Sequence, residues 1–314
     1  MTFVLIDAKN ALFRFGFSNR SLHSSSGQAT GAVYGVLGVL LRLKKKYPDG
    51  RFAMCWDVDG GAQNGWRRAL YSGYKANRQV NGSFDTDRIA MFSQIPYIKR
   101  LGALMNIPQV EIPGHEADDL ICLFASRYMS QGKVVVYSGD HDFWQLVPRI
   151  TILTKQKDGE SLHSITAKDV AEKFRCKPED VLKVRAIAGD GSDGIPPAVR
   201  GIGVVKASVL VAAGANPALE SFEYHSYAVK QSIAVLKEAW GDVRRNYQLM
   251  ALPLDGSVPG QSGATPPPLP DLRKLPKRTK HQIGQFLSIL SDLELSEAVR
   301  NRSDLWSIQS VILA

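Results

Sequence analysis

The run from Lys133 to Leu146 is the feature that most constrains the fold of this chain. Its apolar, β-branched segment Val134–Tyr137 ends in Ser138-Gly139 and is followed by Asp140 and Asp142. Such a segment is typical of a buried parallel strand, and open α/β sheets bind ligands in the loops that follow their strands. Neighbouring carboxylates repel each other unless a cation lies between them. A hard divalent metal is the simplest such cation, so the sequence predicts a metal site here.

A second acidic group lies about twenty residues upstream. Glu116, Asp118 and Asp119 precede the apolar run Leu120–Phe124, which predicts a helix with an acidic N-terminus. One acid in this position would simply complement the helix dipole. Three acids, on a helix that leads into a strand ending in two more, favour a shared metal site instead.

Two further predicted strands also end in an acid. Phe3–Ile6 is followed by Asp7, and Arg51–Trp56 is followed by Asp57. A single acid after a strand is usually a turn or cap residue, but the repetition argues against coincidence. We therefore expect these carboxylates to converge at one edge of an α/β sheet.

Composition and charge narrow the class of protein. The 314 residues carry a formal net charge of +9, with a pI near 9.4, which indicates a polyanionic partner. The charge alone does not separate nucleic acid from an anionic membrane surface. Three widely spaced cysteines predict neither a disulfide framework nor a zinc site. The apolar start Met1–Ile6 is too short for a signal peptide and no apolar run approaches 18 residues, so we expect a cytoplasmic protein.

The segment between the second strand and Arg100 is basic and aromatic. A solvated, charged loop is the usual explanation for such a run, but rings among cations also suit single-stranded nucleic acid, because rings stack on bases and cations hold phosphates. The two tyrosines of this run, Tyr71 and Tyr74, are equally compatible with a purely structural role. The helix Arg88–Leu104 is expected to follow. The candidate DNA-binding residues are Arg67, Arg68, Tyr71, Tyr74, Lys75 and Arg78.

A glycine-rich stretch provides a second candidate nucleic-acid contact. Gly189–Pro197 contains Asp190 and Asp193, and the turn Gly201-Ile202-Gly203 precedes a predicted helix that carries Lys206. A turn of this kind exposes backbone N–H groups to a phosphate. A plain interhelical turn is the default explanation, but the two acids just upstream favour the functional one.

The remaining segments are predicted from spacing and composition. Ser164–Phe174 predicts a helix capped by Thr166, residues 215–250 look helical, and His281–Val299 has helical spacing. Asp255–Pro270 is rich in glycine, proline and serine, and we expect this connector to be poorly ordered.

Taken together, these residues resemble the flap endonuclease and 5′-3′ exonuclease family, which includes phage and bacterial 5′-nucleases and the 5′-nuclease domain of bacterial DNA polymerases. The resemblance covers roughly residues 1–255, and the joint order of its motifs is highly specific. The motifs are Ile6-Asp7, Thr30–Val36, Asp57, Tyr74–Arg78, Glu116–Asp119, Ser138–Leu146, Gly189–Asp193 and Gly201–Ala207.

The resemblance implies an α/β fold, a twisted, mixed and mainly parallel sheet flanked by helices in a PIN-like nuclease core, with a helical arch and a helix-three-turn-helix element that grips duplex DNA. The expected organisation is a nuclease core at 1–160 with the arch at about 60–100, a DNA-binding region at 161–255, a connector at 256–280 and a C-terminal helical segment at 281–314.

The resemblance also implies residue roles. Lys75 and Arg78 match arch cations that face the scissile phosphate, and the turn at Gly201 and Gly203 matches one that can hold a potassium ion against DNA. The chain departs from many relatives at Gly194, where asparagine is common, and at Pro197–Arg200. The acids that match the metal site are Asp7, Asp57, Glu116, Asp118, Asp119, Asp140, Asp142, Asp190 and Asp193.

Nine carboxylates exceed what one Mg²⁺ needs, so we expect two divalent ions about 4 Å apart, Mg²⁺ or alternatively Mn²⁺. One would activate a water and the other would stabilise the departing 3′ oxygen, while Lys75 and Arg78 offset transition-state charge. Asp190, Asp193 and Asp7 are expected to act through water. No histidine nucleophile is required.

The expected function is structure-specific hydrolysis of DNA at 5′ flaps, nicks or duplex ends in replication or repair, by a monomer in a bacterial or phage-infected cytoplasm. RNA in an RNA–DNA hybrid is a further expected substrate, replication proteins are expected partners, and a stand-alone, phage-like role is expected. Three alternatives remain at this point: a PIN-like ribonuclease, a non-catalytic protein that binds DNA structures, and a small-molecule phosphatase.

Overall fold

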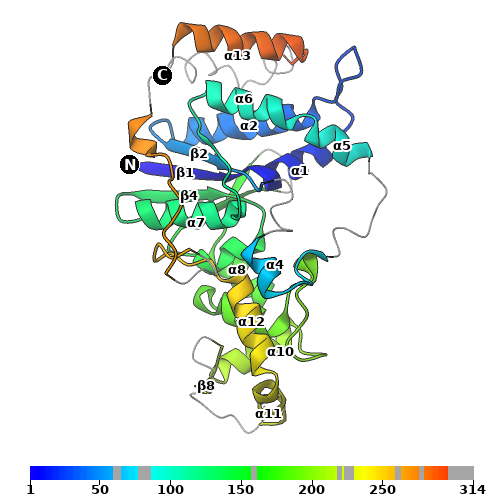
Figure 1. The fold of residues 1–314 in the computed structure, drawn as a ribbon, viewed down its shortest axis with the longest axis vertical. Coiled ribbons are helices and arrows are strands. Elements are labelled where there is room, and N and C mark those ends of the chain that lie inside the picture. The colour runs from blue at the N-terminus through cyan, green and yellow to red at the C-terminus, as the bar shows by residue number, and fades with distance from the viewer. Residues whose placement is uncertain are drawn as a thin grey trace.

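The computed structural model describes residues 1–58, 65–76, 86–156, 161–217, 221–222, 230–258, 263–275 and 279–295. It shows a sheet with helices on both faces and, below it in Figure 1, a smaller region made mostly of helices. The predicted α/β fold, a mixed and mainly parallel sheet flanked by helices, is confirmed, while the helical arch and the helix-three-turn-helix element stay predictions.

The sheet is mixed and mainly parallel, with the strand order β3-β2-β1-β4-β5-β6. All neighbours pair in parallel except β5 and β6, which are antiparallel. Because β1 lies between β2 and β4, the carboxyl ends of these three strands meet at one edge of the sheet. The strands are β1 (Thr2–Asp7), β2 (Arg51–Cys55), β3 (Gln109–Val110), β4 (Lys133–Tyr137), β5 (Thr151–Lys155) and β6 (Leu162–Ser164).

The β1 strand is apolar throughout because helices bury both of its faces. Val4 and Ile6 pack on the face that is covered by four helices, and Phe3 and Leu5 pack on the opposite face. The helices on the first face are α1 (Ala8–Ser18), α2 (Gly31–Lys46), α6 (Ile95–Leu104) and α13 (Lys280–Asp292); those on the second are α7 (Ala117–Tyr128) and α8 (Ala167–Phe174).

The boundary predicted at residue 160 falls inside the sheet. Strand β6, at Leu162–Ser164, pairs with β5, and Val170 and Phe174 of α8 pack in the same core cluster as Phe3 and Leu5. The structural core therefore extends beyond residue 160, because the sheet needs β6 at its edge and α8 on its face.

Helix α8 begins as predicted from its capping residue. The Thr166 hydroxyl accepts a hydrogen bond from Asp169 N, and the Asp169 carboxylate accepts one from Thr166 N at 2.7 Å. We expect Thr166→Ala to lower the free energy of unfolding by about 1 kcal/mol, because one helix N–H loses its partner. Denaturant unfolding measures the loss. Thr166→Ser, which keeps the hydroxyl, serves as the control, and equal losses in both variants would contradict the capping role.

The predicted helix Arg88–Leu104 is two helices, α5 (Thr86–Phe92) and α6. The break lies at Gln94, whose side-chain Oε1 accepts hydrogen bonds from Ala32 N at 2.8 Å and Val33 N at 3.1 Å. Those N–H groups belong to the first turn of α2 and have no partner inside their own helix. Gln94 therefore caps α2, a long-range contact that local spacing does not reveal.

The region below the sheet has its own apolar cluster, formed by α9, α10, α11 and α12. The prediction of continuous helix over 215–250 is wrong in part. Ala215–Asn216 (β7) pairs with Ser221–Phe222 (β8) in a short antiparallel sheet, and the described helices of this range are Lys230–Glu238 and Trp240–Met250. The helices are α9 (Val181–Ala188), α10 (Val204–Ala212), α11 (Lys230–Glu238) and α12 (Trp240–Met250).

The connector and the C-terminal helix both pack onto the core where they are described. Leu272 is fully buried and its N–H donates to the Tyr128 hydroxyl at 2.9 Å. Leu272 lies just beyond the predicted connector Asp255–Pro270. At the end of that connector Leu269 packs against the same core cluster, and its carbonyl accepts from Arg127 at 3.1 Å. Residues 259–262 lie outside the described residues, and the expected poor order of the connector stays a prediction. Phe286 and Leu290 of α13 are buried against the face that carries α2 and α6.

Short helices complete the described elements, and no helix among the described ranges is long and apolar enough to cross a membrane. They are α4 (Trp66–Leu70) and the 3-10 turns η2 (His141–Leu146), η3 (Pro178–Asp180), η4 (Gly191–Asp193) and η6 (Leu272–Lys274).

Candidate active site at the carboxyl edge of the sheet

Asp7 lies at the end of β1 and begins the site. Its carboxylate caps α1 by accepting from Asn10 N at 3.1 Å and also accepts from the Ser138 hydroxyl at 2.8 Å, which joins β1 to β4. Burial, and then the negative charge of Asp57, raise the pKa of Asp7 to about 6. Both effects disfavour the charged form of the carboxylate.

Asp57 follows β2 and joins it to α7. One carboxylate oxygen accepts from Ala117 N at 2.8 Å, in the first turn of α7, and the other lies 3.8 Å from the ammonium of Lys9. A carboxylate at this position is favoured by the partial positive charge of the helix N-terminus.

Asp140 and Asp142 follow β4, as the sequence predicts. Asp140 caps the turn η2, because it accepts from Asp142 N at 2.9 Å. The surrounding chain partly shields Asp140 from bulk water, although the Asp140 side chain keeps exposed surface. This partial shielding, and then the charge of Asp142, raise the pKa of Asp140 well above its usual range. His141 packs edge-on against Trp144, 4.8 Å between ring centroids, rather than joining the acids.

Asp190 belongs to the helical region and is brought to Asp142 by a buried arginine. The guanidinium of Arg185, on α9, contacts both carboxylates and is only 4% exposed. Asp190 also caps η4 by accepting from Ser192 N at 2.9 Å. Gly194 ends this turn with φ +70°, a conformation open to both glycine and asparagine, so the departure predicted at this position is compatible with the turn.

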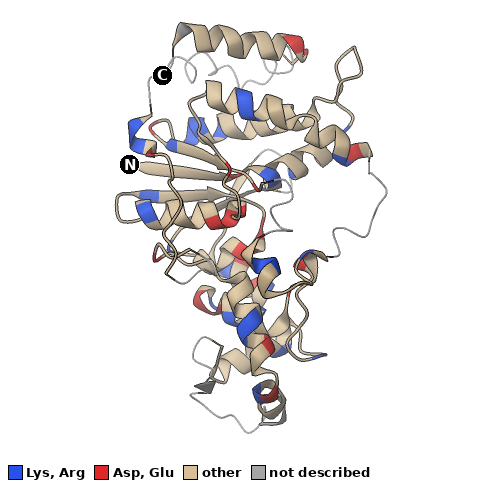
Figure 2. Cartoon of the chain, in the orientation of Figure 1, with Lys and Arg blue, Asp and Glu red and all other residues tan. Residues whose placement is uncertain are grey.

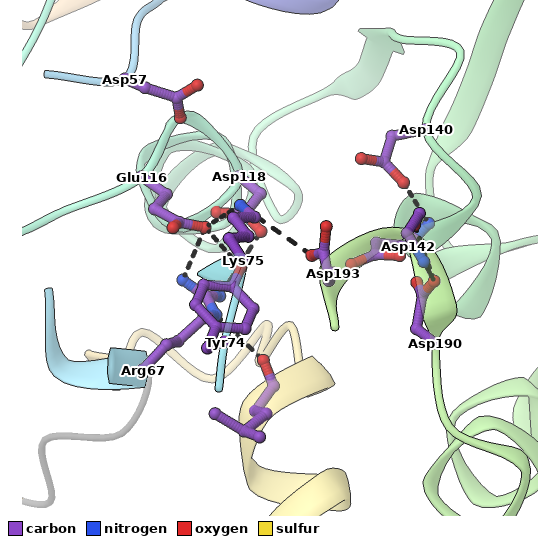
Figure 3. A network of polar contacts seen from close by, with 12 residues as sticks. Asp57, Arg67, Tyr74, Lys75, Glu116, Asp118, Asp140, Asp142, Asp190 and Asp193 are labelled. Atoms are coloured by element: carbon purple, nitrogen blue, oxygen red, sulfur yellow. Dashed lines mark hydrogen bonds and ion pairs between the residues drawn. The ribbon is translucent and has the colours of Figure 1, made fainter. Parts of the chain in front are cut away.

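The acids of α7 surround a second buried arginine, Arg67 of α4 (Figure 3). Its Nη1 lies 3.0 Å and its Nη2 2.8 Å from the two oxygens of Asp119. The same guanidinium lies 3.4 Å from Glu116 and 3.4 Å from Asp118. Its Nε donates to the carbonyl oxygen of Leu249 at 2.9 Å.

Lys75 lies between α7 and the η4 loop. Its ammonium is 2.8 Å from Glu116 and 3.9 Å from Asp193, and its backbone N–H donates to the Asp193 carbonyl at 2.7 Å. Tyr74 donates its hydroxyl to Glu116 at 2.9 Å. Burial alone would raise the pKa of Glu116, but the charges of Arg67 and then Lys75 outweigh burial and lower that pKa to about 2.

The acids therefore form two groups around one space, as Figure 3 shows. One group, Glu116 and Asp118, lies at the start of α7 beside Lys75. The other group lies opposite and consists of Asp140, Asp142 and Asp190, and Asp193 lies between the two groups. In the part of the chain that the structure describes, no three His, Cys, Asp or Glu side chains are gathered closely enough to enclose a metal ion.

The donor set nevertheless fits hard divalent cations. The carboxylate oxygens are the ligands that Mg²⁺ and Mn²⁺ prefer. Burial raises the pKa values of Asp7 and Asp140 most, and the next contributions are the charges of Asp57 and Asp142, so neighbouring carboxylates repel each other in this site. Bound cations would relieve this repulsion.

Some predicted residues lie where their predicted role is not possible in this conformation. Arg67 is 3% and Tyr74 is 2% exposed, so neither can contact DNA; both instead hold the acids of α7. Asp119 is fully buried, with both oxygens bonded to Arg67, and does not face the other acids as a metal ligand would. Arg78 lies outside the described residues.

Other predicted DNA contacts remain accessible. Gly201, with φ +84°, Gly203 and Lys206 are exposed at the turn before α10, and Arg68 is partly exposed. The ring of Tyr71 is partly exposed and lies under the guanidinium of Arg245, 4.5 Å from its centroid. These residues stay candidates for contact with a polyanion.

The sequence reasoning missed the role of Arg185. It lies within the otherwise apolar run of α9, where the only other charged residue is Lys183. A cation in such a run needs a buried partner, and the acids of the next loop were the obvious candidates. This signal was available before the structure was known.

Comparison with known proteins agrees with this geometry. Residues 2–175 match the model of the 5′-3′ exonuclease N-terminal, resolvase-like domain. The chain belongs to the 5′-3′ exonuclease family. The resemblance inferred from the motifs is thereby confirmed, and the phosphatase alternative finds no support.

Among relatives of this family member, the 5′-3′ exonuclease of Aquifex aeolicus is 31% identical over 203 residues, 64% of this chain and 66% of that protein. DNA polymerase I of Pseudomonas aeruginosa is 36% identical over 201 residues, 64% of this chain and 21% of that protein. The chain thus spans about a fifth of this polymerase and just under two thirds of the exonuclease.

Solved structures of similar fold include a T5 5′-exonuclease and the catalytic core of Rad2 in complex with a DNA substrate. The T5 5′-exonuclease with bound zinc has a TM-score of 0.65 at 18% identity, over 93% of this chain and 99% of that one. The catalytic core of Rad2 in complex with DNA has a TM-score of 0.53 at 12% identity, over 99% and 92%. At these identities the likeness concerns the fold alone.

Proposed function

We propose that this family member is a divalent-metal-dependent, structure-specific 5′-nuclease that hydrolyses DNA phosphodiesters near a free 5′ end, at flaps, nicks or duplex ends. The observation that carries the proposal is the position of Lys75. Its ammonium lies beside Glu116 and near Asp193, between two groups of acids that come from distant parts of the sequence. A phosphate bound there would meet this cation and any ions held by the acids.

Eight acids would hold two divalent ions, Mg²⁺ or Mn²⁺. Metal ions bound there would supply a nucleophilic hydroxide at neutral pH and neutralise charge on the leaving 3′ oxygen. The proposed ligands, direct or through water, are Asp7, Asp57, Glu116, Asp118, Asp140, Asp142, Asp190 and Asp193.

Lys75 would contribute a fixed positive charge to the reaction. Burial alone would lower the pKa of Lys75, but the charges of Glu116 and then Asp193 raise it above its usual value. The ammonium therefore stays protonated at neutral pH and can stabilise negative charge on the phosphoryl oxygens. The Tyr74 hydroxyl, bonded to Glu116, holds that carboxylate in place beside Lys75. We assign Arg78 the same electrostatic role in the arch.

The exposed turn at Gly201–Gly203 would contact the duplex part of the substrate. Its glycines let a phosphate approach the backbone N–H groups at the start of α10, and Lys206 adds charge one turn later. A potassium ion against DNA at this turn is part of the proposal, and it requires DNA affinity to be higher in K⁺ than in Na⁺ at equal ionic strength.

Lys206→Ala tests the DNA contact. We expect weaker binding of a duplex with a 5′ flap and a salt slope of log affinity that is smaller by about one, because one phosphate contact is lost. Fluorescence anisotropy over a salt series, with EDTA present, measures both. Lys46→Ala, which removes an exposed lysine at the end of α2, is the matched control. Equal slopes for the two variants would place the duplex elsewhere.

The activity itself is tested with five 5′-labelled substrates: a double flap, the matching blunt duplex, the single DNA strand, a single-stranded RNA, and an RNA–DNA hybrid. With Mg²⁺ or Mn²⁺ we expect cleavage near the flap junction or from the 5′ end, and none with EDTA. Cleavage of single-stranded RNA in preference to the DNA flap would support the PIN-like ribonuclease alternative. Tight binding of the flap without cleavage in either metal would support the alternative of a non-catalytic protein that binds DNA structures.

We propose a cellular role for this chain from the names of its relatives. The bacterial exonuclease and DNA polymerase I proteins support a cytoplasmic role in DNA replication, with primer or flap removal as the reaction. We propose that the chain acts as a monomer and that replication proteins recruit it.

A further inference from the structure

We propose that Arg67 is a positioning residue that fixes the metal-site acids of α7 to the base of the arch, and that Asp119 is its counterion and not a metal ligand. This inference rests on the proposed function and refines its site. It replaces both a DNA contact by Arg67 and a metal contact by Asp119.

The geometry of the pair is that of a fork on a carboxylate. Two guanidinium nitrogens of Arg67 bond the two oxygens of Asp119, at 3.0 and 2.8 Å. The oxygen Oδ2 also accepts from Glu116 N at 3.1 Å, as part of the capping box of α7. With Asp119 fully buried, its oxygens are committed to these donors.

Arg67 has no surface left for a ligand either. Its side chain is 3% exposed, and its third nitrogen, Nε, donates to the Leu249 carbonyl at the end of α12. The Arg67 side chain therefore joins α4 to α7 and to α12. Its partners Asp119 and Leu249 lie 52 and 182 residues further along the sequence. The basic colour on α4 and the acidic colour at the start of α7 in Figure 2 mark the two elements that these hydrogen bonds join.

This arrangement sets the position of the acids that do face the site. The same guanidinium lies 3.4 Å from Glu116 and from Asp118, and Lys75 follows α4 by five residues. Arginine rather than lysine is needed, because only a planar fork bonds both oxygens of Asp119 and the Leu249 carbonyl at once. Partners that orient metal ligands in this way usually affect metal affinity.

The first test is Arg67→Lys, which keeps the charge and removes the fork. We expect Mn²⁺ affinity, measured by electron paramagnetic resonance without DNA, to fall about tenfold, and kcat on a flap to fall as well. The salt slope of DNA binding stays that of wild type, whereas Lys206→Ala lowers it. A smaller slope with unchanged Mn²⁺ affinity would make Arg67 a DNA contact and overturn the proposal.

The second test compares two adjacent acids. Asp118→Asn is expected to weaken Mn²⁺ binding about tenfold or more, because it removes a proposed ligand, while Asp119→Asn leaves the number of bound Mn²⁺ ions unchanged. Asparagine can still accept from Glu116 N, and Arg67 keeps Glu116 and Leu249 as partners. Equal losses of bound Mn²⁺ in both variants would show Asp119 to be a ligand and refute the counterion role.

A double-mutant cycle in EDTA tests the pair independently of metal and of activity. The unfolding equilibrium constants of Arg67→Met, Asp119→Asn and the double variant are expected to be non-additive by about tenfold or more, since each single change leaves one buried charge without its partner. Additive effects would refute the pair. Wild-type protein that binds no Mn²⁺ would refute the proposed function, and the cycle would still decide the role of Arg67.

Discussion

Replacing Asp140 by asparagine is expected to lower cleavage of a 5′ flap on the order of a thousandfold, with DNA binding in EDTA retained. Asp140 follows β4 on the side of the site opposite Glu116 and Asp118. Partial burial, and then the charge of the neighbouring Asp142, raise the pKa of Asp140. The amide oxygen of the introduced asparagine can still accept from Asp142 N, so the cap on η2 is kept. The side chain lacks the negative charge that a divalent ion requires. Single-turnover cleavage in Mg²⁺ and anisotropy in EDTA measure the two effects.

Asp49→Asn is the matched control for this variant. Asp49 is an exposed carboxylate in the turn before β2, at the opposite end of the strands from the site. We expect wild-type cleavage from it. If Asp140→Asn cleaves within tenfold of wild type, Asp140 does not hold a catalytic ion, and the proposed assignment of the acids fails.

Asp7→Asn is expected to stabilise the metal-free protein while it lowers cleavage. The pKa of Asp7 is raised from 3.8 to about 6 by burial, and then by the charge of Asp57. A raised pKa means that the folded state holds the proton more tightly than the unfolded state. The associated stability is therefore full below about pH 4, is lost as the pH rises to about 6, and stays lost above it. The shift corresponds to as much as about 3 kcal/mol at pH 7.5.

Denaturant unfolding in EDTA at pH 4 and pH 7.5 measures this effect. The amide oxygen of the introduced asparagine can still accept from Asn10 N, so the cap on α1 survives, and the gain should appear at pH 7.5 and shrink at pH 4. Added Mg²⁺ should stabilise wild type more than the variant. Asp49→Asn should show neither effect. A variant that is less stable than wild type at pH 7.5 would mean that Asp7 is needed as an anion by the fold itself.

The sheet and most of the acids could be predicted from the sequence because their patterns are local. The short, β-branched apolar runs at Phe3–Ile6 and Val134–Tyr137 favour strands buried on both faces, which is what a parallel sheet between helices provides. Parallel pairing brings their carboxyl ends together, so Asp7 and Asp140 approach one another without any further information.

The predicted helices were wrong where the deciding contact is long-range or the pattern is too short to recognise. The helix break at Gln94 serves a cap on α2, some sixty residues earlier, and the short strand at Ala215–Asn216 depends on its pairing with Ser221–Phe222. The cap partner of Gln94 is not visible in a local window of sequence. The partner strand of Ala215–Asn216 begins only five residues after Asn216, but two-residue strands are too short to show an alternating pattern.

The sequence by itself determined which acids and cations this chain brings to one edge of a parallel sheet. Only the tertiary structure decided their roles. Arg67 and Lys75 lie eight residues apart in one basic run, yet Arg67 is buried against Asp119 and Leu249 while Lys75 stands between Glu116 and Asp193. The physical reason is that the free energy of a charge depends on its burial and on the opposite charges within a few ångströms, and those neighbours come from elements far apart in the chain.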